Sequence, residues 1–118
     1  MNSATSLKML KRWWHDYLVR SGHYLHSTKN PRLSQSRNGK KNRYRWLLFV
    51  SPTPVLYLSQ NEKKLIQQQL KRAKSFTEKL FLVVGFTVEP ERVVVLPAEM
   101  VLETIYIRSD IGGIEWEE

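Results

Sequence analysis

The stretch from Val55 to Phe86 constrains the fold most, because it predicts a strand, a helix and a second strand in succession. Its first segment, Val55 to Leu58, is short and rich in β-branched and aromatic residues, as strands are. Its last segment, Leu80 to Phe86, is apolar without alternation, which is typical of a strand covered on both faces. A helix that connects two strands of one sheet usually makes them parallel. We therefore expect a central mixed sheet with this helix lying on it.

The helix between these strands has its own start signal and an apolar stripe. Ser59 and Glu62 form an S-x-x-E pattern, in which the serine hydroxyl accepts from a backbone N–H three residues later and the glutamate accepts from the serine N–H. Apolar residues then recur at helical spacing and predict one buried face, consisting of Leu65, Ile66, Leu70, Ala73 and Phe76. The other face is basic and polar, and we expect it in solvent.

The remaining segments extend this pattern on both sides. In chain order they are a helix from about Leu7 to Arg20 ended by Gly22, a short strand His23 to His26, a strand Arg43 to Val50, a strand Arg92 to Leu96 paired with Leu80 to Phe86, and a short helix Ala98 to Leu102 opened by Pro97. The chain is therefore predicted to be one α/β (α+β) domain, residues 1–118, in the order α-β-β-β-α-β-β-α. Its central mixed sheet should have about four to five strands.

Composition excludes several classes of protein. The chain has no cysteine, so disulfides, thiolate catalysis and cysteine-ligated zinc are excluded. The longest apolar run, Leu80 to Phe86, is far shorter than the roughly 20 residues that span a bilayer, and no apolar signal segment precedes the first charges. We expect a cytoplasmic or nucleoid-associated protein with no membrane partner.

Positive charge is concentrated in the first half of the chain. Residues 1–50 contain eleven Lys or Arg and one acid, a net charge of +10, whereas residues 51–118 contain eight and ten, a net charge of −2. Such asymmetry indicates a polyanionic partner for the basic half. A solvated basic surface without a partner is the alternative.

Residues 27–42 are polar and basic, and we expect either a flexible loop or a hairpin that turns at Asn38-Gly39. The basic residues here are interleaved with Asn, Gln, Ser and Tyr, side chains that contact phosphates and base edges. We predict a nucleic-acid contact, with double-stranded DNA the expected partner, through Lys29, Arg32, Arg37, Lys40, Lys41, Arg43 and Arg45. The alternative is a disordered segment that only increases solubility.

The order of elements resembles the PD-(D/E)xK, or restriction-endonuclease-like, nuclease superfamily. The resemblance rests on Glu62 to Leu102 and on the first helix with its Arg20-Ser21-Gly22-His23-Tyr24 end. Ferredoxin-like and other small α+β folds share parts of this order. The resemblance implies a nuclease-like fold in which an aspartate on one central strand and E-x-K on the next hold magnesium.

That catalytic motif is not intact here. The resemblance implies the aspartate within Arg43 to Val50 and the E-x-K on Val55 to Leu58, and neither segment contains an acid. A literal E-x-K occurs at Glu62-Lys63-Lys64, where Glu62 has the alternative role of capping the helix. We predict no metal site and no resident cofactor for the main hypothesis.

Three hypotheses follow for the function. The first is a DNA-binding protein with a nuclease-like fold and no complete catalytic site. The second is a magnesium-dependent endonuclease with a displaced site at Glu62 and Lys64, which leaves enzymatic activity uncertain. The third is a non-catalytic subunit or inhibitor that binds a larger protein complex through the Trp-rich first helix and the C-terminal segment, for which an exposed apolar patch around Trp13 or Trp14 and Trp116 would be the sign. A second copy of the chain is a further expected partner.

Overall fold

The computed structural model describes residues 3–26, 28–88, 91–104, 106–110 and 114–115. The elements are, in order, α1 (Ser3–Arg20), β1 (Tyr24–His26), β2 (Leu33–Asn38), β3 (Asn42–Ser51), β4 (Val55–Tyr57), α2 (Gln60–Ser75), β5 (Lys79–Phe86), β6 (Arg92–Pro97), α3 (Ala98–Val101), β7 (Tyr106–Arg108) and β8 (Ile114–Glu115). The predicted mixed α+β class is confirmed. None of the helices in the described ranges is long and apolar enough to cross a membrane.

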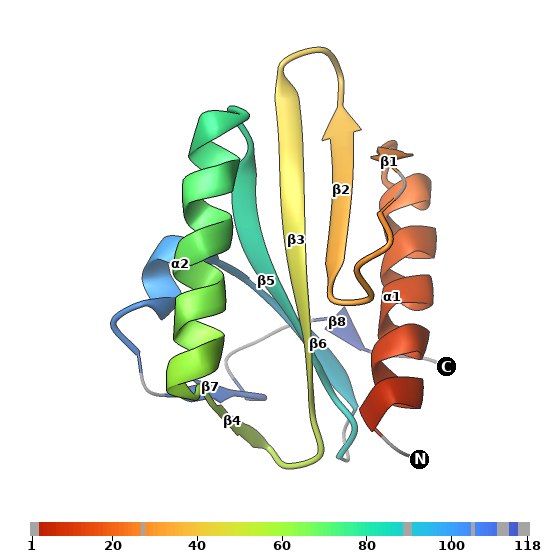
Figure 1. The fold of residues 1–118 in the computed structure, drawn as a ribbon. Helices are drawn as coiled ribbons and strands as arrows, with labels where there is room; N and C mark the ends of the chain where they lie inside the picture. Colours follow the sequence, from red (N-terminus) through yellow and green to blue (C-terminus); the bar gives the residue numbers. More distant parts are fainter. Residues whose placement is uncertain (1–2, 27, 89–90, 105, 111–113, 116–118) are drawn as a thin grey trace.

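One mixed sheet forms the centre of the molecule, with a helix against each face (Figure 1). The order of its strands is β1-β2-β3-β5-β6-β8. The central pair, β3 and β5, is parallel, and every other pairing in this sheet is antiparallel. The predicted hairpin between Leu80–Phe86 and Arg92–Leu96 is the β5–β6 pair.

The expectation that Val55 to Leu58 lies in the central sheet is wrong. β4 instead pairs with β7 in a separate two-stranded sheet. The strand that runs parallel to β5 is β3, which is ten residues long and fills the central position. Pro52 and Pro54 follow β3 directly and cannot donate backbone hydrogen bonds, so the chain leaves the sheet there before α2 begins.

The two faces of the sheet have separate hydrophobic cores. On the face covered by α2, side chains such as Ile66 and Ala73 pack with Phe49, Leu82 and Val84 of the sheet. On the face covered by α1, the core consists of Leu10, Trp14, Leu18, Trp46, Leu48, Val83 and Val93. Because β3 and β5 contribute alternate residues to both cores, they are apolar without interruption.

The predicted capping of α2 is confirmed in full. Glu62 N–H donates to Ser59 Oγ at 3.1 Å, and Ser59 N–H donates to Glu62 Oε1 at 2.9 Å. Gly22 ends the first helical segment with a φ of +88°, a left-handed value that glycine adopts without steric cost.

The tryptophans of α1 lie mostly inside. Trp14 is buried against Trp46, with ring centroids 5.1 Å apart, and Trp13 is half-buried and stacks on Tyr17. Trp116 lies outside the described residues. The side chains of α1 therefore give little support to a tryptophan-based protein interface.

Candidate nucleic-acid interface

The β2–β3 hairpin carries exposed cations at and near its tip. Its turn contains Gly39 at a φ of +81°, where a residue with a Cβ would be strained. Arg37 and Arg43 are partners in the β2–β3 register, so their side chains lie on the same face of the sheet. The Arg37 guanidinium also lies 5.4 Å from the centre of the Tyr24 ring. The exposed cations of the hairpin are Arg37, Lys40, Lys41 and Arg43.

Further cations reach the same end of the molecule from other elements. The hairpin tip, the last turn of α2 and the start of β5 lie together at the top of Figure 1. Arg72 and Lys74 of α2 and Lys79 of β5 are exposed there. The helical pattern predicts that Arg72 and Lys74 face solvent, but it gives them no role, and nothing in the sequence singles out Lys79, because only the topology brings this end together. We call the seven exposed cations Arg37, Lys40, Lys41, Arg43, Arg72, Lys74 and Lys79 the basic end.

Three of the predicted contact residues are held elsewhere or used internally. The side chain of Arg45 is only 5 % exposed and forms an ion pair with Glu78, Nη2 to Oε1, at 2.9 Å. The Arg32 guanidinium donates through Nη1 to a backbone carbonyl of β3 at 3.0 Å. Lys29 is exposed in the connection between β1 and β2. This connection precedes the first residue of β2, whereas the hairpin turn follows the last one. Of the predicted contact residues, Arg37, Lys40, Lys41 and Arg43 are the ones exposed together on the hairpin, and the nucleic-acid role of the whole set stays a prediction.

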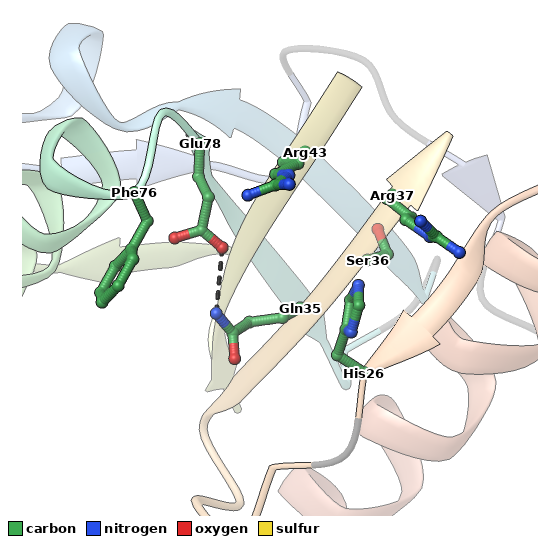
Figure 2. Close-up of a pocket in the computed structure, with 7 residues that line it drawn as sticks. All are labelled: His26, Gln35, Ser36, Arg37, Arg43, Phe76 and Glu78. Atoms are coloured by element: carbon green, nitrogen blue, oxygen red, sulfur yellow. Dashed lines mark hydrogen bonds between the residues drawn. The ribbon is translucent and has the colours of Figure 1, made fainter. Parts of the chain in front are cut away.

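A cavity of about 340 Å³ lies between the hairpin and the end of α2. Figure 2 shows its lining side chains around a common space, with Phe76 and Glu78 on one side and His26 and Arg37 on the other. Gln35 lies on the floor and donates through Nε2 to Glu78 Oε2 at 2.9 Å. The complete lining is His26, Gln35, Ser36, Arg37, Arg43, Phe76 and Glu78.

Phe76 and Glu78 reach this cavity because of the turn that joins α2 to β5. The prediction that Phe76 belongs to the buried stripe of the helix is wrong, since α2 ends at Ser75 and the ring of Phe76 is 57 % exposed. Thr77 has a φ of +55°, which is uncommon for a β-branched residue and reverses the chain within one position. On the helix itself, Gln69 is buried on the inner side and accepts a hydrogen bond from Arg45 Nη1 at 2.8 Å.

Glu62 and Lys64, the residues of the displaced catalytic site, lie on the first turns of α2. The backbone N–H and the Oε1 atom of Glu62 are both used in the capping box at the start of α2. Lys64 is exposed and lines a surface hollow of about 430 Å³ on α2 together with Gln67, Gln68, Leu70, Lys71 and Lys74. The catalytic role of Glu62 and Lys64 stays a prediction, and in the part of the chain that the structure describes Glu62 belongs to no cluster of three metal-ligating side chains.

The residues at the positions implied for magnesium ligands do not fit that ion. Magnesium takes oxygen ligands in near-octahedral geometry. The middle of β3 is buried hydrocarbon, and β4 consists of Val55, Leu56 and Tyr57. Within the described ranges, no three His, Cys, Asp or Glu side chains come together as a metal site would require. We therefore derive no metal-dependent step for this chain.

Two histidines lie between α1 and the sheet, on the face opposite the cavity. His15 Nε2 and Ser34 Oγ are 2.7 Å apart, and His23 Nδ1 and Ser36 Oγ are 2.9 Å apart. Burial lowers the pKa of both imidazoles, and the charge of Lys11 lowers the pKa of His15 further. Burial therefore favours the neutral form of both imidazoles near pH 7, and their contacts with buried serines favour a structural role.

Comparison with known proteins supports the fold. No protein-family model matches the chain, and no curated protein sequence matches it. Among solved structures, it is similar to Hjc, a Holliday junction resolvase from the archaeal hyperthermophile Archaeoglobus fulgidus, with a TM-score of 0.62 and 19% sequence identity over 89% of each chain. Hjc belongs to the restriction-endonuclease-like superfamily. The chain thus has a nuclease-like fold.

Proposed function

We propose that this protein binds DNA through the basic end and does so without a complete catalytic site of its own. One observation carries the proposal: cations from β2, β3, α2 and β5, far apart in the sequence, are exposed at one end of the fold. Between residues 28 and 88 the chain has two acids, Glu62 and Glu78. Glu62 lies at the opposite end of α2, and Glu78 is neutralised by Arg45.

The physical reason for DNA as the partner is the match of charge and shape. Lysine and arginine side chains displace the counterions condensed on DNA, which supplies sequence-independent affinity. A two-stranded β-ribbon fits the major groove, where arginine and asparagine side chains read base edges. The β2–β3 hairpin has Asn38 and Asn42 as its last register pair, next to the exposed arginines. The similarity to a Holliday junction resolvase supports the same partner class.

The test is a fluorescence-anisotropy titration of a labelled blunt 20-bp duplex at several salt concentrations. If the four hairpin cations each neutralise one phosphate, log K should fall with log salt with a slope of about −3.6, and any contacts from α2 or β5 would steepen it. The double variant Lys40→Glu/Lys41→Glu should weaken binding and make the slope shallower by about 1.8.

The matched control is Lys8→Glu/Arg12→Glu, which makes the same change of charge at exposed positions of α1. It should retain a slope within experimental error of the unmodified protein. Absence of duplex binding at low salt, or equal effects of the two double variants, would refute the assignment of the basic end.

A cleavage assay separates this proposal from an endonuclease. Supercoiled plasmid incubated with the protein and magnesium should remain intact, because the described residues provide no set of oxygen ligands for that ion. Nicking that disappears in Glu62→Ala would instead establish the displaced site at Glu62.

A further inference from the structure

We propose that the cavity beside the hairpin binds one unpaired nucleotide, so that the protein prefers DNA in which a duplex adjoins a single strand. In this arrangement Phe76 stacks on the base, the oxygens of Gln35 and Glu78 accept hydrogen bonds from its edge, and Arg37 and Arg43 hold the adjoining phosphates. The inference deepens the proposed function and rests on it, since the duplex part would be held by the basic end.

First, Phe76 is placed to offer an aromatic face to the cavity. The residue is 57 % exposed and so forgoes much hydrophobic stabilisation, yet it lines a polar cavity. The Arg45 guanidinium lies 5.9 Å from the ring centre and is itself fixed by Glu78 and Gln69. The ring is therefore supported from the protein side and still presents much of its surface to solvent. Such exposed aromatic surfaces bind bases by stacking, whatever the base.

The second step is the polarity of the floor. The side chain of Glu78 is only 7 % exposed, and Gln35 Nε2 donates to its Oε2. That hydrogen bond uses one of the two amide N–H groups and leaves Gln35 Oε1 as an acceptor, so the oxygens of Gln35 and Glu78 make the floor rich in acceptors. Adenine, cytosine and guanine carry exocyclic amines that donate to such groups, whereas thymine presents carbonyl oxygens in the corresponding place.

The third step is the separation of charge between floor and rim. The Glu78 carboxylate is paired with Arg45 and offers only acceptor oxygens, so a phosphate, which also only accepts, finds no donor on Glu78. Arg37 and Arg43 line the same cavity and are exposed to solvent. Their guanidinium groups can therefore bind a backbone phosphate at the rim while they keep part of their hydration. The nucleotide is therefore expected to bind with its base inside the cavity, against the acceptor oxygens, and with its phosphate at the rim, against the two arginines.

The fourth step is the requirement that the nucleotide be unpaired. A base inside a duplex has both faces stacked and its edge paired, so it cannot offer a free face to Phe76 and a free edge to Gln35 at once. A single-stranded overhang, a gap or a base turned out of the helix presents both. At about 340 Å³, the cavity is at the small end of the range for small-molecule sites, roughly 300–1,000 Å³, which suits one nucleotide.

The experiment compares three probes that share one 20-bp duplex: blunt, with a four-nucleotide cytosine overhang, and with the same overhang made of abasic sites. The unmodified protein should bind the cytosine overhang about fivefold to a hundredfold more tightly than the blunt duplex, the range for one base–aromatic stack. The abasic overhang should lose this gain. A thymine overhang should bind about fivefold or more weakly than cytosine.

The variant Phe76→Ala should abolish the gain for the cytosine overhang and leave blunt-duplex affinity unchanged, whereas Phe76→Trp should retain the gain. Tyr57→Ala, at an exposed tyrosine on the separate β4–β7 sheet, is the matched control. Because the ring of Phe76 is largely exposed, far-ultraviolet circular dichroism should show that the variant is folded.

The outcomes separate this inference from the proposed function. Duplex binding with no preference for the cytosine overhang, or a preference that survives in Phe76→Ala, overturns the nucleotide cavity and leaves the basic end standing. A preference of thymine over cytosine overturns the role of Gln35 and Glu78. Tight binding of the cytosine overhang that depends on Phe76, without measurable binding of the blunt duplex, supports the cavity and refutes duplex binding. No binding of any probe overturns both.

Discussion

Removing Glu78 should destabilise the protein more than any other single change at an acidic residue in the described part of the chain. Its carboxylate is paired with the Arg45 guanidinium, and the two side chains are only 7 % and 5 % exposed. Arg45 also donates to Gln69, so its guanidinium is held on two sides inside the protein. Without Glu78 that charge would remain buried with one neutral partner and no counter-ion.

The expected magnitude for Glu78→Ala is a loss of about 3–5 kcal/mol in the free energy of unfolding, the usual cost of breaking a buried ion pair on one side. With an m-value of about 1.5 kcal/mol/M, the urea midpoint should fall by about 2–3 M. The assay is urea unfolding followed by tryptophan fluorescence, for which Trp14 and Trp46 are buried reporters.

A double-mutant cycle distinguishes the ion pair from simple loss of packing. Arg45→Met/Glu78→Leu replaces both charges with side chains of similar size, and it should recover most of the stability lost in Glu78→Leu alone. The reasoning fails if Glu78→Ala costs less than about 1 kcal/mol, or if the two single changes add without coupling in the double variant.

Three further predictions concern α1, α2 and the hairpin. Burial holds the pKa of His15 and His23 below the usual histidine value of about 6.5, so the unfolded chain takes up protons first as pH falls. The urea midpoint should therefore decrease below about pH 6.5, and the decrease should be smaller in His15→Gln/His23→Asn. Ser59→Ala removes half of the capping box and should cost about 1 kcal/mol by thermal or urea unfolding, whereas Ser59→Asp should cost little. Gly39→Ala forces a Cβ into a left-handed turn and should cost about 1 kcal/mol, while Gly39→Asn, which tolerates that conformation better, should cost less.

The local parts of the fold were predictable from the sequence because their signals lie within a few residues. Ser59 and Glu62 are three positions apart and define the start of α2 by themselves. The parallel partner of β5 was not predictable in this way, since Val55–Leu58 and Arg43–Val50 are both suitable strands. Only the packing of the complete sheet and the prolines after β3 decide between them.

In the candidate site, too, the features that depend on neighbouring residues were predictable, and those that depend on distant residues were not. The hairpin cations follow from composition and from the Asn38-Gly39 turn, both of which are local. The internal role of Arg45 depends on Glu78, which is 33 residues away, so the alternation of Arg43, Tyr44, Arg45 and Trp46 could not separate an exposed arginine from a buried one. The one usable signal for Glu78 was an isolated acid next to a long apolar strand in a basic region.

The parallel pairing of β3 with β5 also has a consequence for the order of events during synthesis. Every residue of β3 from Tyr44 to Ser51 finds its central neighbour 35 positions later, between Lys79 and Phe86. A nascent chain that has emerged only as far as α2 can form the β2–β3 hairpin, but it has no neighbour for the inner edge of β3. Residue 86 must emerge from the ribosome before β3 and β5 can pair along their full length. This small domain is therefore expected to fold late in synthesis and as one unit.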